Sequence, residues 1–252
     1  MNSNSDHTSS TTRQSLDRCQ RKRIYLLRHG DVSYLQKDGT PVPDSRTVPL
    51  TEAGWANARL TAEALQEVHF DRAICSGLRR TVETASAMMD SRPDLELEHY
   101  PDLEEIQGIR RRTEQEKFNL IHAAYAFWDC QKPDSDYSHG ESYSHAAQRT
   151  QSTIVKLLAE DGWSTMLAVC HGGVNRLLLS WAIGAPITSM ACFEQEPCCI
   201  NIIDVDLDTD RNIKRCILRG TNISARDLSH HKNQWTTMER LALSLLPESR
   251  SP

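Results

Sequence analysis

The sequence predicts an α/β protein, a three-layer α/β/α sandwich with a mostly parallel central sheet and a helical insertion over its candidate active site. Three short apolar runs, at 24–27, 73–75 and 166–170, read as buried strands, and a helical pattern follows each after a turn or loop. Strands that alternate with helices favour a parallel sheet. A chain of 252 residues can bury one sizeable core, so we expect a single domain over residues 21–252.

The first part of the chain divides into a tail, a strand, a loop and a helix. Residues 1–20 are dominated by Ser, Thr, Asn and Gln, which predicts a disordered tail because so little apolar surface cannot offset the entropy of ordering. The stretch 36–49 is rich in Pro, Gly and Asp, which indicates a loop. Thr51 is the expected N-cap of a helix that carries Leu60, Ala64 and Val68 on one face.

The second part of the chain continues the alternation. A strand is expected at 95–100, and the irregular, aromatic stretch 107–140 predicts the helical insertion. Its aromatic residues could line a substrate lid, but the spacing of Phe118, Ile121, Tyr125 and Trp128 favours a helix that packs them onto the core. The remaining expected elements are a helix at 142–160, strands near 200–206 and 213–218, and a last helix in the segment after 227.

Composition argues against several classes of protein. A formal net charge of -5 disfavours general binding of nucleic acid. No stretch is long and apolar enough to cross a bilayer, and the N-terminus lacks the apolar centre of a signal peptide, so we expect a cytoplasmic protein without a membrane partner. The 8 cysteines form no C-x-x-C pair, which predicts reduced, mostly buried thiols rather than a metal site.

The three apolar runs end next to residues that bind anions. Arg28 and His29 follow the first run, Arg80 comes shortly after the second, and His171 follows the third. Ligands of open α/β sheets bind outside the carboxyl ends of the strands, where helix N-termini also offer free N–H groups. We therefore expect these four side chains to face one anion-binding crevice.

This set of residues suits phosphoryl transfer, which needs cations, a nucleophile and an acid. Arg28 and Arg80 can each present paired N–H donors to phosphate. Either histidine could attack phosphorus, since a neutral imidazole is nucleophilic near pH 7. Glu104 and Glu105 follow the strand at 95–100, and from the residues alone either could supply the proton or be a solvated loop charge.

Taken together, the chain resembles the histidine phosphatase superfamily, also called the phosphoglycerate mutase-like superfamily. The resemblance spans roughly residues 23–206, in family order, and rests on the segments 27–30, 49–54, 76–81, 84–85, 103–106, 140–142 and 171–176.

The resemblance implies a role for each candidate residue. It implies that His29 is the phosphorylated nucleophile and Glu105 the proton donor, and that Arg28, Arg80 and His171 bind the phosphate. It also implies that no metal or other cofactor is used. The implied activity is a metal-independent phosphatase that hydrolyses a small-molecule phosphomonoester through a phosphohistidine, and a homodimer is left open.

Two alternatives to this activity stay open. A phosphoglycerate mutase would return the phosphoryl group to its substrate, but family mutases carry a Trp-Asn pair after the first motif, whereas residues 31–35 contain no asparagine. A low-turnover scaffold that only binds phosphate is the other alternative. The presence of all five site residues argues against it.

Overall fold

A six-stranded sheet lies at the centre of the computed structural model, which describes residues 20–36, 38, 40, 42–108, 124–131, 135–136, 140–230 and 235–244. The strands are β1 (Gln20–Arg28), β2 (Arg72–Cys75), β3 (Leu97–His99), β4 (Thr165–Cys170), β5 (Ile200–Leu207) and β6 (Ile213–Ile223). Their order across the sheet is β3-β2-β4-β1-β5-β6. The first three neighbouring pairs are parallel, and β1 with β5 and β5 with β6 are antiparallel. The predicted mostly parallel sheet is confirmed, and β5 alone among these six runs against the others.

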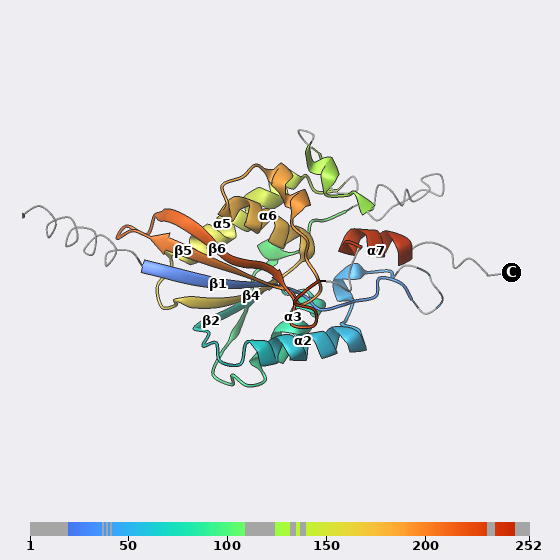
Figure 1. Ribbon diagram of the computed structural model, residues 1–252, viewed down its shortest axis with the longest axis horizontal. Helices are drawn as coiled ribbons and strands as arrows, with labels where there is room; N and C mark the ends of the chain where they lie inside the picture. The colour runs from blue at the N-terminus through green and yellow to red at the C-terminus, as the bar shows by residue number, and fades with distance from the viewer. Residues whose placement is uncertain are drawn as a thin grey trace, which may run out of the picture.

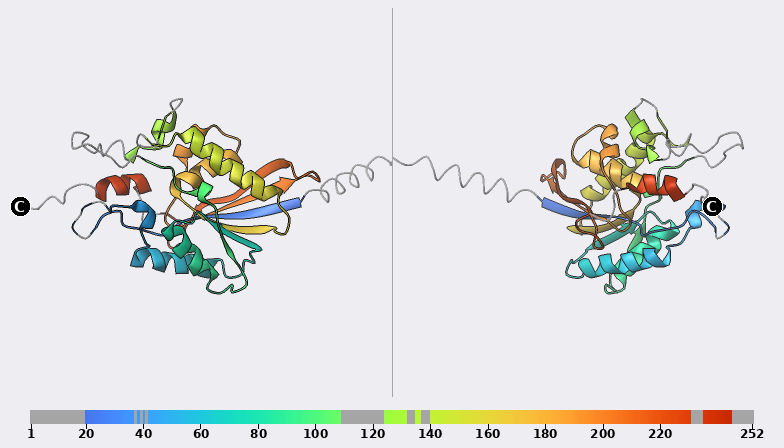
Figure 2. Two further views of the ribbon diagram at one scale, coloured as in Figure 1. Left: turned by 180° about the vertical axis from the view of Figure 1, so that it is seen from behind. Right: turned by 45° about the vertical axis from the view of Figure 1, so that its right-hand side comes forward.

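Helices cover both faces of the sheet and give the predicted three layers (Figures 1 and 2). α5 (Tyr143–Ala159) and α6 (Gly172–Ala182) pack on one face, and α2 (Glu52–Ala64) and α3 (Arg79–Met89) pack on the other. α7 (Thr237–Ser244), red in Figure 1, lies near the carboxyl end of β1 and confirms the expected last helix. Short 3₁₀ helices occur at η1 (Ser45–Thr47), η2 (Pro101–Leu103), η3 (Trp128–Gln131) and η4 (Ile187–Cys192).

The side chains of β1 alternate between two separate cores, because successive residues of a strand point to opposite faces. Ile24 and Leu26 pack with residues of α5 and α6, whereas Tyr25 and Leu27 pack with residues of α2 and α3. A strand that is buried on both faces is apolar throughout. This is why the run at 24–27 shows no polar alternation.

α2 begins where the sequence predicts. Thr51 is its N-cap, and the Thr51 hydroxyl oxygen accepts from the N–H of Gly54 at 3.0 Å and donates to Oδ2 of Asp31 at 2.8 Å. A side chain on Gly54 would place its Cβ 2.3 Å from the carbonyl oxygen of Asp31. Gly54 is therefore required for the close approach of α2 to the loop that follows β1.

The predicted apolar face of this helix is wrong. Leu60 and Ala64 are exposed, and Val68 lies beyond the end of the helix. The helix packs closely against α3 and the backbone near Cys198, where small side chains fit better than large ones, and the Thr61 hydroxyl donates to the Cys198 carbonyl oxygen at 3.2 Å. The buried positions are Gly54, Ala58 and Thr61.

The described part of the insertion differs from the expected pattern. Tyr125 and Trp128 are 53% and 50% exposed, whereas Phe127 is 9% exposed and packs in a core cluster with Ile106. The prediction that Tyr125 and Trp128 are buried is therefore wrong. Residues 125–131 form a turn and a 3₁₀ helix, so the spacing of an α-helix does not apply to them. Phe118 and the rest of 109–123 lie outside the described residues, as do 132–134, 137–139 and residues 1–19 of the tail predicted at 1–20. Gln20, the last residue of that predicted tail, instead begins β1, where it pairs with Leu207 of β5.

Candidate active site

Three neighbouring parallel strands end at one edge of the sheet, and the predicted residues follow them. Arg28 is the last residue of β1, and His29 comes next. His171 follows β4, which pairs with β1, so the two imidazole rings lie with their centroids 5.2 Å apart. The turn after β2 leads to Arg80 in the first turn of α3, and the charges of Arg80 and Arg28 act on both histidines. The structure thus brings the four residues together.

The ring of His29 has a fixed orientation and a fixed tautomer. Its Nδ1 lies 2.7 Å from the carbonyl oxygen of Gly30, which can only accept, so Nδ1 carries the proton. Nε2 therefore carries the lone pair. The side chain is 2% exposed, and burial first, then Arg80 and Arg28, lower the pKa of His29 well below its ordinary value. The imidazole is neutral at neutral pH.

His171 is held by a chain of hydroxyl groups. The Thr81 hydroxyl donates to the carbonyl oxygen of Leu78 at 2.7 Å, so Ser76 Oγ donates to Thr81 across 3.0 Å. With the Ser76 proton used in this way, Nε2 of His171 must donate to Ser76 Oγ across 2.8 Å. Burial, Arg80, His29 and Arg28, in that order, lower the pKa of His171. The neutral ring consequently presents Nδ1 without a proton.

Three polar atoms of the predicted residues lack a hydrogen-bond partner among the described residues. These atoms are Nε of Arg28, Nε of Arg80 and Nδ1 of His171, and all three are buried. Each arginine is anchored elsewhere, since Nη1 of Arg28 donates to the Gln195 carbonyl oxygen at 2.6 Å and Nη1 of Arg80 donates to that of Ser45 at 2.9 Å. A buried donor without a partner costs about 1–3 kcal/mol. The cluster therefore suits an anion that has several acceptor oxygens.

The structure separates the two glutamates that the residues alone left equivalent. Glu105 lies at the N-terminus of α6, where its carboxylate accepts from the N–H groups of Gly173 at 3.1 Å and Ile106 at 3.0 Å. A Cβ on Gly173 would lie 2.6 Å from that carboxylate, so glycine is needed for this approach. Glu104 instead pairs with Arg46 of η1 at 2.5 and 2.7 Å. Glu105 is therefore the glutamate at the N-terminus of α6, the helix whose N-cap is His171.

Sequence reasoning missed two residues that hold parts of the site in place, one acting on the backbone and one on a side chain. Arg149 on α5 donates to the carbonyl oxygens of Asp102 and Glu104 at 2.6 and 2.8 Å, and it also pairs with Glu141 at 2.6 Å. Gln195 supplies the carbonyl oxygen that holds Arg28. Arg149 is far along the chain from Glu104, and Gln195 is far from Arg28, so no local sequence pattern indicates these two contacts. Glu141 precedes Ser142, the N-cap of α5, so helical periodicity does not pair it with Arg149.

Metal clusters and membrane-spanning helices are both absent from the residues that the structure describes. Within them, no three His, Cys, Asp or Glu side chains gather in a group that could hold a metal ion. No described helix is long and apolar enough to cross a membrane.

Two neutral histidines and two arginines lie together at the carboxyl edge of a parallel sheet and beside a helix N-terminus, an arrangement that suits the binding of an anion by an α/β protein. The sequence model of the histidine phosphatase superfamily (branch 1) matches residues 24–216, which contain all of these residues. The chain belongs to this superfamily.

Known proteins show the same similarity. The chain is 28% identical over 190 residues to the adenosylcobalamin/alpha-ribazole phosphatase of Salmonella typhi, covering 73% of this chain and 90% of the relative. It is 28% identical over 186 residues to a Proteus mirabilis protein named "probable phosphoglycerate mutase GpmB", covering 72% of this chain and 84% of that protein. The crystal structure of the alpha-ribazole phosphatase from Shigella flexneri superposes with a TM-score of 0.62 at 27% identity, covering 79% of this chain and 96% of that structure.

Proposed function

We propose that this protein is a phosphoric monoester hydrolase that transfers a phosphoryl group from a small phosphomonoester to His29 and then to water. In the proposed reaction the cations come from arginine and histidine side chains, so no metal ion or other cofactor takes part.

The fixed orientation of the His29 ring is the observation that carries this proposal. Its Nδ1 donates to Gly30, and burial keeps the ring neutral, so Nε2 holds a lone pair without further activation. A neutral imidazole nitrogen in this state is a nucleophile for phosphorus. The buried histidine is thus poised to form a phosphoramidate.

The unpartnered donors around His29 support binding of the phosphoryl group. In the proposed complex its oxygens accept from the Nε groups of Arg28 and Arg80. The negative charge of the bound phosphoryl group also favours protonation of Nδ1 of His171, and the protonated Nδ1 is then a third donor. Fixed donors aimed at the phosphoryl oxygens stabilise the charge of the transition state.

The proposed reaction has two steps. First, Nε2 of His29 forms a bond to phosphorus while the ester P–O bond breaks, and the departing oxygen takes a proton from the protonated form of Glu105. In the second step the Glu105 carboxylate takes a proton from water, the water oxygen attacks phosphorus, and the P–N bond breaks. Orthophosphate leaves and neutral His29 is restored.

The names of the relatives guide the choice of substrates. Two of the three proteins compared above are alpha-ribazole phosphatases, so alpha-ribazole 5′-phosphate belongs in the first panel. A phosphoglycerate and a sugar phosphate complete that panel, since they share the phosphomonoester and differ in the leaving group.

The first experiment is hydrolysis of p-nitrophenyl phosphate in excess chelator by the wild type and by His29→Ala. We expect chelator-resistant activity that falls by about 10³-fold or more in the variant, because the covalent step loses its nucleophile. His69→Ala is the matched control, since the His69 side chain is 89% exposed, and it should retain full activity. Activity that survives in His29→Ala, or that the chelator abolishes, contradicts the proposal.

A second assay, with a phosphoglycerate in place of p-nitrophenyl phosphate, distinguishes a hydrolase from the mutase alternative, which the similarity to the Proteus mirabilis protein favours. With a phosphoglycerate as substrate, a hydrolase releases orthophosphate, whereas a mutase returns the phosphoryl group to a glycerate. Binding of phosphate without either product would instead indicate a scaffold.

A further inference from the structure

The C-terminal helix α7 lies outside the stretch that matches the superfamily, yet it contacts the candidate phosphate site. The match ends at residue 216, and α7 comprises Thr237–Ser244. The Thr237 hydroxyl oxygen lies 3.4 Å from Nη1 of Arg28, a residue 209 positions earlier. It also lies 3.0 Å from the Gln195 carbonyl oxygen, to which the same Nη1 donates. A segment beyond the family core therefore contacts an arginine predicted to bind phosphate.

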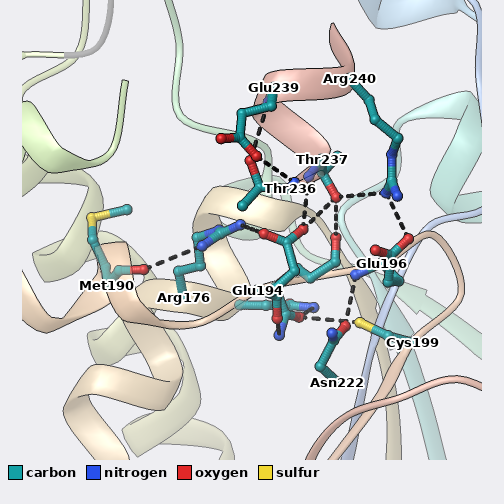
Figure 3. A network of polar contacts seen from close by, with 12 residues as sticks. Arg176, Met190, Glu194, Glu196, Cys199, Asn222, Thr236, Thr237, Glu239 and Arg240 are labelled. Carbon is teal, nitrogen blue, oxygen red and sulfur yellow. Dashed lines mark hydrogen bonds and ion pairs between the residues drawn. The ribbon is translucent and has the colours of Figure 1, made fainter. Parts of the chain in front are cut away.

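Thr237 is the centre of a network of polar contacts (Figure 3). Its Oγ1 lies 2.5 Å from Oε1 of Glu194 and 3.0 Å from the Gln195 carbonyl oxygen, and both of these oxygens only accept. The hydroxyl has one proton, which it donates to the nearer and charged Glu194 oxygen. The N–H of Thr237 donates to the same oxygen at 3.0 Å. The hydroxyl oxygen is then left to accept from Arg28 at 3.4 Å and from Nη2 of Arg240 at 3.3 Å. One hydroxyl group thus links α7, Glu194 and Arg28.

Glu194 is itself firmly anchored, so the network is not a loose surface contact. Its Oε2 accepts from Nη2 of Arg176 at 3.1 Å, and Arg176 is 4% exposed and stacks over the ring of Phe127. Burial raises the pKa of Glu194, but Arg176 and the contacts with Thr237 outweigh it and lower that pKa. The carboxylate therefore stays ionised and keeps the Thr237 hydroxyl oriented.

We infer that Thr237 is a positioning residue for Arg28, and that α7 is thereby part of the phosphate site. The Gln195 carbonyl oxygen and the Thr237 hydroxyl together restrain Nη1 of Arg28, while Nε of the same guanidinium remains without a partner among the described residues. Loss of the hydroxyl removes one of these two restraints, so the guanidinium samples more orientations and binds an anion less tightly. The inference rests on the proposed function, because that function assigns Arg28 to phosphate.

The test is the Kd of the full-length protein for inorganic phosphate, measured by calorimetry well below the unfolding temperature. Thr237→Val keeps the shape of the side chain and removes the hydroxyl, and we expect it to weaken binding about fivefold, as for the loss of one hydrogen bond. Thr237→Ser restores the hydroxyl and should bind phosphate within about twofold of the wild type. The Ki of phosphate in p-nitrophenyl phosphate hydrolysis should follow the same order.

The matched control on the same helix is Thr236→Ala. Thr236 Oγ1 accepts from the N–H of Glu239 at 3.2 Å, and Glu239 in turn accepts from the N–H of Thr236, so this variant loosens the start of α7 and leaves the Thr237 hydroxyl in place. We expect it to bind phosphate as the wild type does.

The possible outcomes are distinct. If Thr237→Val binds phosphate as tightly as the wild type, the inference fails while the proposed function stands. If Thr236→Ala weakens binding as much as Thr237→Val, the attachment of α7 matters and the hydroxyl does not, which also overturns the assignment. If the wild type binds no phosphate, the proposed function fails and the inference fails with it.

Discussion

Two histidines with almost no exposure show how burial selects a protonation state. His29 and His171 are 2% and 0% exposed, and burial lowers the pKa of each, with the two nearby arginines adding to the effect. Each ring has one hydrogen-bonded nitrogen, which fixes the tautomer and leaves the other nitrogen toward the site. The surroundings of these residues thus set both the charge and the direction of the lone pairs.

This arrangement predicts that stability falls as the pH is lowered from 7 to 5. The unfolded histidines titrate near pH 6.5 and the folded ones well below it, so the unfolded state binds more protons in this window. Below pH 6.5 the free energy of unfolding should decrease by up to about 1.4 kcal/mol per pH unit for each histidine. Urea unfolding at pH 7, 6 and 5 measures the slope.

A histidine variant isolates this contribution from that of other groups. His171→Asn should show a shallower dependence on pH than the wild type, whereas substitution of the exposed His69 by Asn should leave the slope unchanged. An identical slope in wild type and His171→Asn would show that the buried ring does not control the acid sensitivity.

At the scale of elements, the segment that leads to Glu105 is fixed by a helix from another part of the chain. Arg149 of α5 donates to the carbonyl oxygens of Asp102, Glu104 and Glu105, the last at 3.4 Å, and it is aligned by Glu141. One guanidinium thus bridges η2 and α5. The position of the Glu105 carboxylate depends on this bridge as well as on the N-terminus of α6.

We therefore expect Arg149→Met to affect protonation of the leaving group more than phosphate binding. The variant should slow hydrolysis of an alkyl phosphate about tenfold more than hydrolysis of p-nitrophenyl phosphate, because nitrophenolate leaves without a proton. Relative kcat values for the two esters measure this, and Glu105→Gln should give the same pattern. Arg79→Met, at an exposed arginine of α3, is the control and should slow neither ester. Equal slowing of both esters by Arg149→Met would rule out the positioning role.

The elements differ in how well the sequence predicts them, for physical reasons. β1, β2 and β4 are buried on both faces, so their apolar runs stand out, and the residues that end them could be placed at one edge of the sheet. The face of α2 was misassigned because close packing against α3 selects small residues rather than large apolar ones. The contacts of Arg149 and Thr237 join segments far apart in the chain, and no local periodicity encodes them.

At the scale of the whole molecule, the antiparallel edge of the sheet is joined by ion pairs. Asp204 and Asp206 on β5 each accept from one arginine of β1 and one of β6, at 2.6 to 2.8 Å. The Asp204 side chain is 0% exposed, and hydrogen bonds from Arg21 lower the pKa of Asp206 to about 2 even though burial opposes the shift. These pairs connect β1 to β5 and β6. The arginines are Arg21, Arg23, Arg215 and Arg219.

Substitution of Asp204 by Ala should destabilise the protein by about 1–2 kcal/mol, because Arg23 and Arg219 lose a buried carboxylate but are themselves 38% and 46% exposed and stay solvated. Urea unfolding at pH 7 measures the change in free energy. Asp161 pairs with Arg211 and its side chain is 74% exposed. Asp161→Ala should therefore lower the free energy of unfolding by less than about 1 kcal/mol. Equal effects of the two variants would show that the buried aspartate has no special role.

The position of β1 in the sheet has a consequence for the synthesis of this protein. Among the six described strands β1 leaves the ribosome first, but it lies between β4 and β5, whose residues are made more than a hundred positions later. At ordinary rates of translation the nascent chain carries this apolar strand without partners for on the order of ten seconds. His29 is therefore made early and acquires its surroundings late, and chains that stop before residue 200 are expected to aggregate rather than fold.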